Sequence, residues 1–173
     1  MKRSMEVEAK YRLKPDQIPQ LRAILGKALE ETCQTDRYFE VPSKVLRLRQ
    51  EGEKIFLTQK GETTLSPEGI KSRFEEEREL TKEMAALLAE ILPWCGHEEK
   101  GTVVKKRSTY RRGEVLFCLD WIEEVGDFLE IEGEEEKEVK EAIVWLEKAI
   151  GLREDQVELS SYAKLVSENQ RGG

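Results

Sequence analysis

Residues 5–13 read Met-Glu-Val-Glu-Ala-Lys-Tyr-Arg-Leu, and apolar and charged side chains alternate through this stretch without a break. The charged positions are Glu6, Glu8, Lys10 and Arg12. Successive side chains of a β-strand point to opposite faces, so a period of two predicts a strand that carries all of its charges on one face. An amphipathic strand usually turns such a face to water.

Like charges recur two residues apart on several of the predicted strands. The pairs are Glu6 with Glu8, Arg47 with Arg49, and Glu130 with Glu132. Such neighbours lie about 6.6 Å apart along a strand, within the Debye length of about 8 Å at physiological salt. Their repulsion is relieved when a divalent cation lies between the carboxylates or a polyanion between the basic groups. The pattern favours an interior site for a metal and a polyphosphate, with a solvated surface as the alternative.

The rest of the chain reads as further strands interrupted by helices. Extended segments are predicted at residues 33–41, 45–49, 55–60, 73–79, 102–110, 115–122 and 128–132, with a loop at 63–69. Helical spacing of Ile18, Leu21, Leu25 and Leu29 predicts a helix that opens at Pro15 and Asp16. A second helix is predicted after Thr81, with Met84, Leu87, Leu88, Ile91 and Leu92 on its buried side. It also predicts a helix over residues 137–152 and a short turn or helix over 162–166. A barrel would point the charged faces of strands far apart in sequence at one interior volume.

Composition limits the function classes. The 173 residues suit one domain, which we expect at 1–168 with a disordered tail at 169–173. The net charge of −7 argues against a nonspecific nucleic-acid partner. No apolar run has the length of a membrane span or of a signal segment, so we expect a cytoplasmic protein without a membrane partner. The three cysteines, Cys33, Cys95 and Cys118, have no disulfide or zinc spacing and are expected to be reduced.

Common catalytic motifs are missing from the sequence. It contains no Gly-x-x-x-x-Gly-Lys phosphate loop, no Gly-x-Gly-x-x-Gly and no Cys-x-x-Cys. The only histidine, His97, follows Gly96 at a predicted helix end, where a capping or solvent role is expected. Catalysis would therefore use carboxylates, lysine, tyrosine or metal-bound water.

Several blocks of the chain resemble one known family. Residues 6–10, Glu-Val-Glu-Ala-Lys, match the Glu-x-Glu-x-Lys signature of the CYTH family, also called triphosphate tunnel metalloenzymes, which includes class IV adenylyl cyclases and thiamine triphosphatases. Further blocks resemble the family in order at residues 36–39, 46–49, 57–61, 105–107, 119–120, 126–132 and 161–162. The resemblance spans roughly residues 5 to 166. It implies an α+β fold, an eight-stranded antiparallel β-barrel that forms a tunnel with flanking helices.

The resemblance also implies a role for each charged residue. Carboxylates expected to hold Mg²⁺ or Mn²⁺ are Glu6, Glu8, Asp120, Glu130 and Glu132, with Glu75 or Glu77 near them. Cations expected to bind the triphosphate are Lys10, Arg47, Arg49, Lys60, Arg73, Lys105 and Arg107. Glu6, Glu8 and Lys10 are the expected catalytic residues. For every one of them, an exposed or purely structural ion pair is the alternative.

Two departures from the family pattern bear on the reaction. Residues 41–45, Val-Pro-Ser-Lys-Val, are shorter than the acidic block that cyclases of the family carry there, and no His-Phe segment of the bacterial cyclase branch is present. Both absences favour a triphosphatase. The expected substrate is a small triphosphate of the tripolyphosphate, ATP or thiamine triphosphate class, and the expected oligomeric state is a monomer or homodimer. An adenylyl cyclase and a noncatalytic polyphosphate-binding module are the alternatives.

Overall fold

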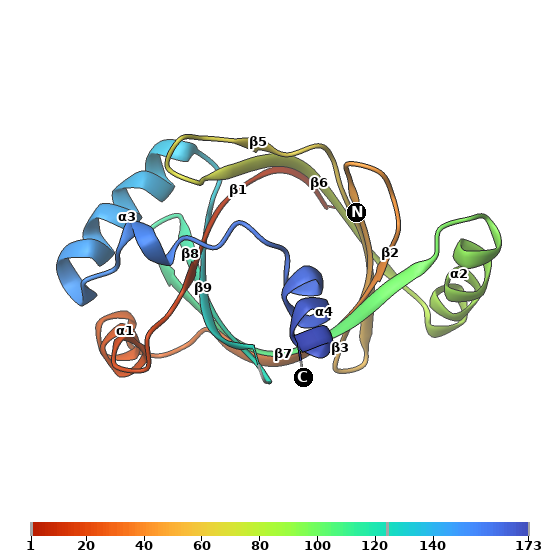
Figure 1. Cartoon of the computed structure of the whole chain (residues 1–173), viewed down its shortest axis with the longest axis horizontal. Coiled ribbons are helices and arrows are strands. Elements are labelled where there is room, and N and C mark those ends of the chain that lie inside the picture. Colours follow the sequence, from red (N-terminus) through yellow and green to blue (C-terminus); the bar gives the residue numbers. More distant parts are fainter. Residues whose placement is uncertain (1, 124, 173) are drawn as a thin grey trace.

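A closed ring of eight antiparallel strands forms the body of the computed structural model, which describes residues 2–123 and 125–172 (Figure 1). Around the ring the strands follow the order β1 (Lys2–Arg12), β9 (Gly126–Gly133), β8 (Val115–Ile122), β7 (Glu99–Arg112), β2 (Glu30–Phe39), β3 (Val45–Glu51), β4 (Lys54–Lys60) and β6 (Lys71–Leu80). Pairing of β6 with β1 closes the barrel, and the short β5 (Thr64–Leu65) pairs with β6 outside it. The predicted fold class is confirmed.

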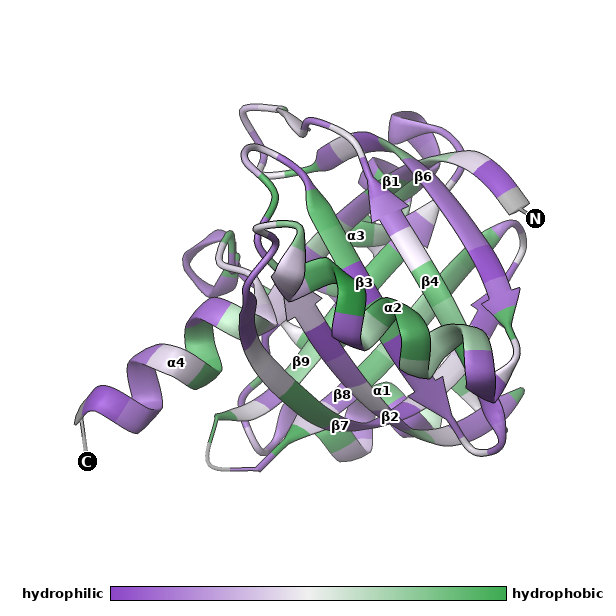
Figure 2. Cartoon of the chain, turned by 90° about the vertical axis from the view of Figure 1, so that its right-hand side faces the viewer, coloured by the Kyte–Doolittle hydropathy of each residue, from purple (hydrophilic) through white to green (hydrophobic). Residues whose placement is uncertain are grey.

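The helices lie outside the barrel wall or at its end. They are α1 (Gln17–Leu25), α2 (Lys82–Trp94), α3 (Glu136–Ile150) and α4 (Tyr162–Gly172), with a 3₁₀ turn η1 (Glu154–Gln156) before α4. Figure 1 shows α1 and α3 on one side of the ring and α2 on the other. Figures 1 and 2 together place α4 at one end of the barrel. None of the helices in the described ranges is long and apolar enough to cross a membrane.

The main hydrophobic core lies between the barrel and the helices, not within the barrel. Val7 and Ala9 of β1 and Ile131 of β9 belong to one buried cluster with Val139 and Leu146 of α3. The apolar positions of the alternating strands therefore face outward, where burial against helices stabilises the fold. The charged positions are left facing the interior, which in a barrel of eight strands is wide enough for side chains or for one small ligand.

Two helix predictions were wrong in part. The first helix ends at Leu25, because Gly26 adopts a left-handed φ of 76° that an α-helix cannot continue, and Leu29 is exposed. In α2, Met84, Leu87 and Ile91 are exposed as well. The helix meets the barrel through Ala85 and Ala89, together with Leu88 and Leu92, for which the prediction is confirmed. Figure 2, in which α2 faces the viewer, shows hydrophobic residues along the outward-facing ribbon of this helix. Hydrophobic spacing cannot tell which of two adjacent apolar stripes is covered.

Other element bounds differ modestly from the sequence predictions. β7 begins at Glu99 rather than at residue 102, and the predicted loop at 63–69 contains β5. α4 runs to Gly172, well beyond the turn predicted at 162–166. Residues 169–172 of the expected tail thus belong to α4, and Gly173 lies outside the described residues. The three cysteines are free thiols.

Candidate active site

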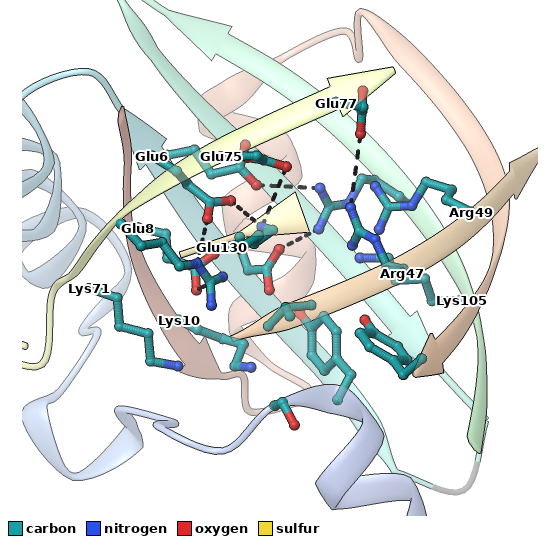
Figure 3. Close-up of a pocket in the computed structure, with 18 residues that line it drawn as sticks. Glu6, Glu8, Lys10, Arg47, Arg49, Lys71, Glu75, Glu77, Lys105 and Glu130 are labelled. Carbon is teal, nitrogen blue, oxygen red and sulfur yellow. Dashed lines mark hydrogen bonds and ion pairs between the residues drawn. The ribbon is translucent and has the colours of Figure 1, made fainter. Parts of the chain in front are cut away.

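A cavity of about 230 Å³ lies inside the barrel and is lined by the charged faces of its strands (Figure 3). Every site residue predicted from the sequence lines this cavity except Asp120. Many of these charged side chains are deeply buried, and Lys10 and Lys105 are only 4% and 2% exposed. Buried charges are costly unless they are paired, so the contacts among them decide what the site can bind.

Carboxylates from β1 meet basic residues from β4 and β6 on one side of the cavity. Lys60 Nζ lies 2.6 Å from Glu6 Oε1, and Arg73 Nε lies 2.8 Å from Glu6 Oε2. Arg73 also reaches Glu8 through Nη2 at 3.1 Å. Burial opposes ionisation of Glu6, but Lys60 and Arg73 outweigh it and lower the pKa of Glu6 to about 2. Glu6 is therefore a carboxylate at any physiological pH.

A second carboxylate pair projects from β9. Arg107 of β7 donates a short hydrogen bond to Glu130 and reaches Glu132 Oε1 at 3.3 Å. Burial opposes ionisation of Glu130, yet the neighbouring cations, Arg107 first among them, hold its pKa well below the usual range. Glu132 behaves in the opposite way. Its pKa is raised to about 7, chiefly by burial. Arg107 lowers this pKa, whereas the nearby carboxylates, led by Glu130, raise it.

The raised pKa of Glu132 predicts a pH-dependent cost to stability. Glu132 binds a proton more tightly in the folded state than in the unfolded state. Protonation of Glu132 therefore adds to the free energy of unfolding, fully below pH 4.5, and this gain is lost as the pH rises through about 7. The shift corresponds to at most about 3 to 4 kcal/mol, at about 1.4 kcal/mol per pKa unit. Since 25% of the side chain is exposed, solvent screening reduces this figure. Glu132→Gln, which cannot ionise, should melt a few degrees above the wild type at pH 8 and close to it at pH 4.5.

Thermal denaturation across this pH range checks the expectation. Glu134→Gln, at an exposed position two residues away, is the matched control and should show no pH-dependent difference. A gain for Glu132→Gln of the same size at pH 4.5 and pH 8 would show that ionisation of Glu132 is not the cause.

Basic residues dominate the opposite side of the cavity. Figure 3 shows Arg47, Arg49 and Lys105 gathered there, across from Glu6 and Glu8. Arg47 donates from Nη2 to Thr58 Oγ1 at 3.1 Å, and Thr58 in turn donates to Glu77 at 3.2 Å. Burial disfavours the charge on Arg47, but Asp36 beside it outweighs this and raises its pKa. Arg47 therefore keeps its charge and presents N–H groups to the cavity, as the binding of phosphate oxygens requires. The pKa of the Lys105 ammonium group, in contrast, is lowered, chiefly by burial.

Asp120 lies behind the cavity and not on it. It is fully buried, and its oxygens accept hydrogen bonds from Arg107 at 2.6 Å, from Lys105 at 3.0 Å and from the Tyr162 hydroxyl at 2.9 Å. Burial opposes its ionisation, but Arg107 and Lys105 lower its pKa. The metal role expected for Asp120 stays a prediction, and its contacts in the structure are with cations and a hydroxyl.

Several residues that belong to the site received no site role from the sequence, although four of them lie in the blocks at 36–39 and 161–162. Tyr38, Lys71, Ser161 and Tyr162 also line the cavity, and Asp36 supports it from behind. Lys71 shares its strand parity with Arg73, and Asp36 and Tyr38 share one parity within the predicted segment 33–41, so alternation could have indicated all three. Tyr162 is the first residue of α4 and Ser161 directly precedes it, and no strand pattern could place this helix at the barrel mouth.

The carboxylate set fits a hard divalent cation. Within the described ranges, no three acidic, histidine or cysteine side chains are already arranged as a metal centre, because the carboxylates are held by arginine and lysine. Glu6, Glu8, Glu130 and Glu132 nevertheless supply only oxygen donors to one cavity. Mg²⁺ and Mn²⁺ commonly bind through such carboxylates together with substrate phosphates and water.

Comparisons of the sequence and the structure with known proteins find one domain family and several proteins with a similar fold. The CYTH domain model matches residues 4–160. A Methanocaldococcus jannaschii protein named as a candidate adenylate cyclase is 28% identical over 93% of this chain and 98% of its own length. A Pyrococcus horikoshii structure is 31% identical, with a TM-score of 0.79 over 92% of this chain and 98% of that one. A Hippeastrum adenylyl cyclase candidate, described as having a dominant triphosphatase activity, shares the fold at 23% identity and a TM-score of 0.70, over 96% of both chains.

Proposed function

Because this chain belongs to the CYTH domain family, whose members act on small triphosphates as triphosphatases or adenylyl cyclases, we propose that it is a metal-dependent triphosphatase. It would hydrolyse the terminal phosphate of inorganic tripolyphosphate or of an organic triphosphate such as ATP or thiamine triphosphate. Glu6, Glu8, Glu130 and Glu132 would hold Mg²⁺ or Mn²⁺, which supplies charge neutralisation and an oriented water.

The lining of the cavity carries this proposal. Eighteen residues line it, and only Tyr38, Val45, Ser161 and Tyr162 among them are uncharged. Pockets for organic groups are predominantly apolar and aromatic, so this lining suits a phosphate chain better than a nucleobase. The Tyr162 ring is not free for stacking either, because the ammonium groups of Lys10 and Lys105 lie 4.2 and 4.9 Å from its centroid. A cyclase would have to seat the ribose and α-phosphate in the same space.

The chain's own groups would supply most of the catalysis. In phosphoryl transfer, charge is spread over the phosphate oxygens in the transition state, and positioned cations stabilise it. Arg47, Arg49 and Lys105 would bind those oxygens on one side, while Lys60 and Arg73 would do so beside the carboxylates. Each of these cations is already held in place by an anion or a hydroxyl, so little reorganisation is needed when substrate binds.

Adenylyl cyclase activity is the second candidate, favoured by the name of the M. jannaschii relative. The protein should be incubated with Mg²⁺ or Mn²⁺ and, separately, tripolyphosphate, ATP and thiamine triphosphate, with products identified by ³¹P NMR and chromatography. We expect orthophosphate together with pyrophosphate from tripolyphosphate, or with ADP from ATP. Formation of cyclic AMP and pyrophosphate from ATP would establish the cyclase instead. Binding of all three compounds without turnover would indicate a noncatalytic module.

A further inference from the structure

Two fully buried aspartates lie behind the cavity, and each faces an arginine directly across a strand pair. Asp36 of β2 is opposite Arg49 of β3, and Asp120 of β8 is opposite Arg107 of β7. Arg49 donates from Nε and Nη2 to the two oxygens of Asp36, both at 2.7 Å. Arg107 makes the same two-point contact with Asp120, both bonds being 2.6 Å. The same arrangement thus occurs at two separate places in the barrel wall.

Asp36 also organises the neighbouring arginine. Its Oδ2 atom lies 3.5 Å from Nη1 of Arg47 and 3.4 Å from the Tyr38 hydroxyl. Thr58 holds the other end of the Arg47 guanidinium at Nη2. Nε of Arg47 is buried and has no hydrogen-bond partner among the residues that the structure describes. Arg47 is therefore fixed at two corners of its guanidinium by Asp36 and Thr58.

We propose that Asp36 is a positioning residue, which fixes Arg49 and Arg47 in the orientation that the triphosphatase reaction needs. The inference rests on the proposed function of the cavity. Asp36 does not line the cavity, so it acts through the two arginines. A two-point contact locks the plane of a guanidinium, whereas a single bond lets it turn. A misplacement of about 1 Å in a catalytic site can cost about a hundredfold in rate.

The negative charge of Asp36 affects substrate affinity and catalysis in different ways. Removing the negative charge of Asp36 leaves two arginine charges less compensated, so the cavity becomes more attractive to a polyanion. Affinity for tripolyphosphate should therefore hold or improve, while catalysis suffers because the guanidinium groups are no longer fixed. A loss in kcat without a loss in affinity is the signature of Asp36 as a positioning residue.

The test uses Asp36→Asn, which keeps the side-chain volume and removes the charge. We expect kcat for tripolyphosphate with Mg²⁺ to fall at least tenfold, while the Kd measured by calorimetry rises by less than threefold. Glu99→Gln is the matched control, since Glu99 makes a two-point contact with Arg37 of β2 on the outer surface, at 3.1 and 2.6 Å. It should change neither kcat nor Kd.

Arg49→Lys keeps the test decisive if Asp36→Asn does not fold. This variant preserves the charge and leaves Asp36 paired, but it removes the two-point contact and part of the donor set that Arg49 offers to phosphate. It should therefore show the same fall in kcat with a smaller rise in Kd. In a folded double variant the two losses should not add, because both substitutions break one contact. Unchanged kcat in either folded single variant would overturn the proposal, and so would a Kd that rises as steeply as kcat falls.

An NMR signal that does not depend on turnover separates failure of the proposed triphosphatase function from failure of the positioning role of Asp36. The Nε–H resonance of Arg49 should exchange slowly with water in the wild type and rapidly in Asp36→Asn. If the wild type hydrolyses none of the triphosphates, the proposed function fails, whatever this resonance shows. If the wild type is active and Asp36→Asn is equally active with a mobile Arg49, the positioning role alone is wrong.

Discussion

Glu8→Gln should lower kcat by about a hundredfold or more at limiting Mg²⁺ and leave the barrel folded. Glu8 is 5% exposed and faces the cavity beside Glu6, so the substitution removes a negative charge from the proposed metal ligands without removing volume. Loss of one preorganised electrostatic contact in an active site typically costs about 10²- to 10³-fold in rate. Arg73, which Glu8 contacts at 3.1 Å, keeps its bond to Glu6, so no buried cation is left unpaired.

Glu6→Gln should have a similar effect on activity but a larger one on stability. Glu6 pairs with both Lys60 and Arg73, and breaking buried ion pairs by removing one partner costs several kcal/mol. Raising the Mg²⁺ concentration should restore part of the activity of both variants. Glu76→Gln is the control, because Glu76 pairs with Arg3 on the outer surface of β6. Full activity of Glu8→Gln at limiting Mg²⁺ would remove Glu8 from the proposed metal ligands.

Arg47→Ala should weaken the binding of tripolyphosphate by about 10- to 100-fold. A hydrogen bond to a charged group contributes about 1.5–3 kcal/mol, which corresponds to this range. Arg47 is a better choice than Arg49 for this experiment. Arg49→Ala would strip the fully buried Asp36 of its two shortest hydrogen bonds and confuse lost affinity with lost stability. After Arg47→Ala, Asp36 keeps its two-point contact with Arg49.

Calorimetry in the presence of Mg²⁺ gives the Kd directly, and melting temperature provides a second readout. Ligand at about 100 times its Kd stabilises the native state by about 2.7 kcal/mol, or several degrees for a chain of this size. Arg47→Ala should lose most of that shift at a fixed ligand concentration. Arg22→Ala and Arg78→Ala remove arginines whose side chains are 49% and 54% exposed, and they should retain it. Equal losses in all three variants would favour the solvated-face alternative.

The strands and their two faces could be predicted well from the sequence. Alternation over residues 5–13 indicated a strand with one charged face, and the same parity grouped Arg47 with Arg49 and Glu130 with Glu132. Those side chains line one cavity in the structure. The prediction worked because the alternation of side chains across a strand follows from the backbone geometry of each strand alone. The closure into eight strands came from the resemblance of ordered blocks, not from periodicity.

The sequence by itself determined which residues share a face, and only the tertiary structure decided which partner each of them meets. Asp36 and Asp120 lie on charged faces and looked no different from cavity carboxylates. Strand register then set them opposite Arg49 and Arg107, which occupy their oxygens. Likewise, the spacing in α2 could not show that Met84 stays exposed while Ala85 is buried. The side of a strand to which each side chain points is set locally by the backbone. Strand register and helix docking depend on contacts between residues far apart in sequence, which no local pattern contains.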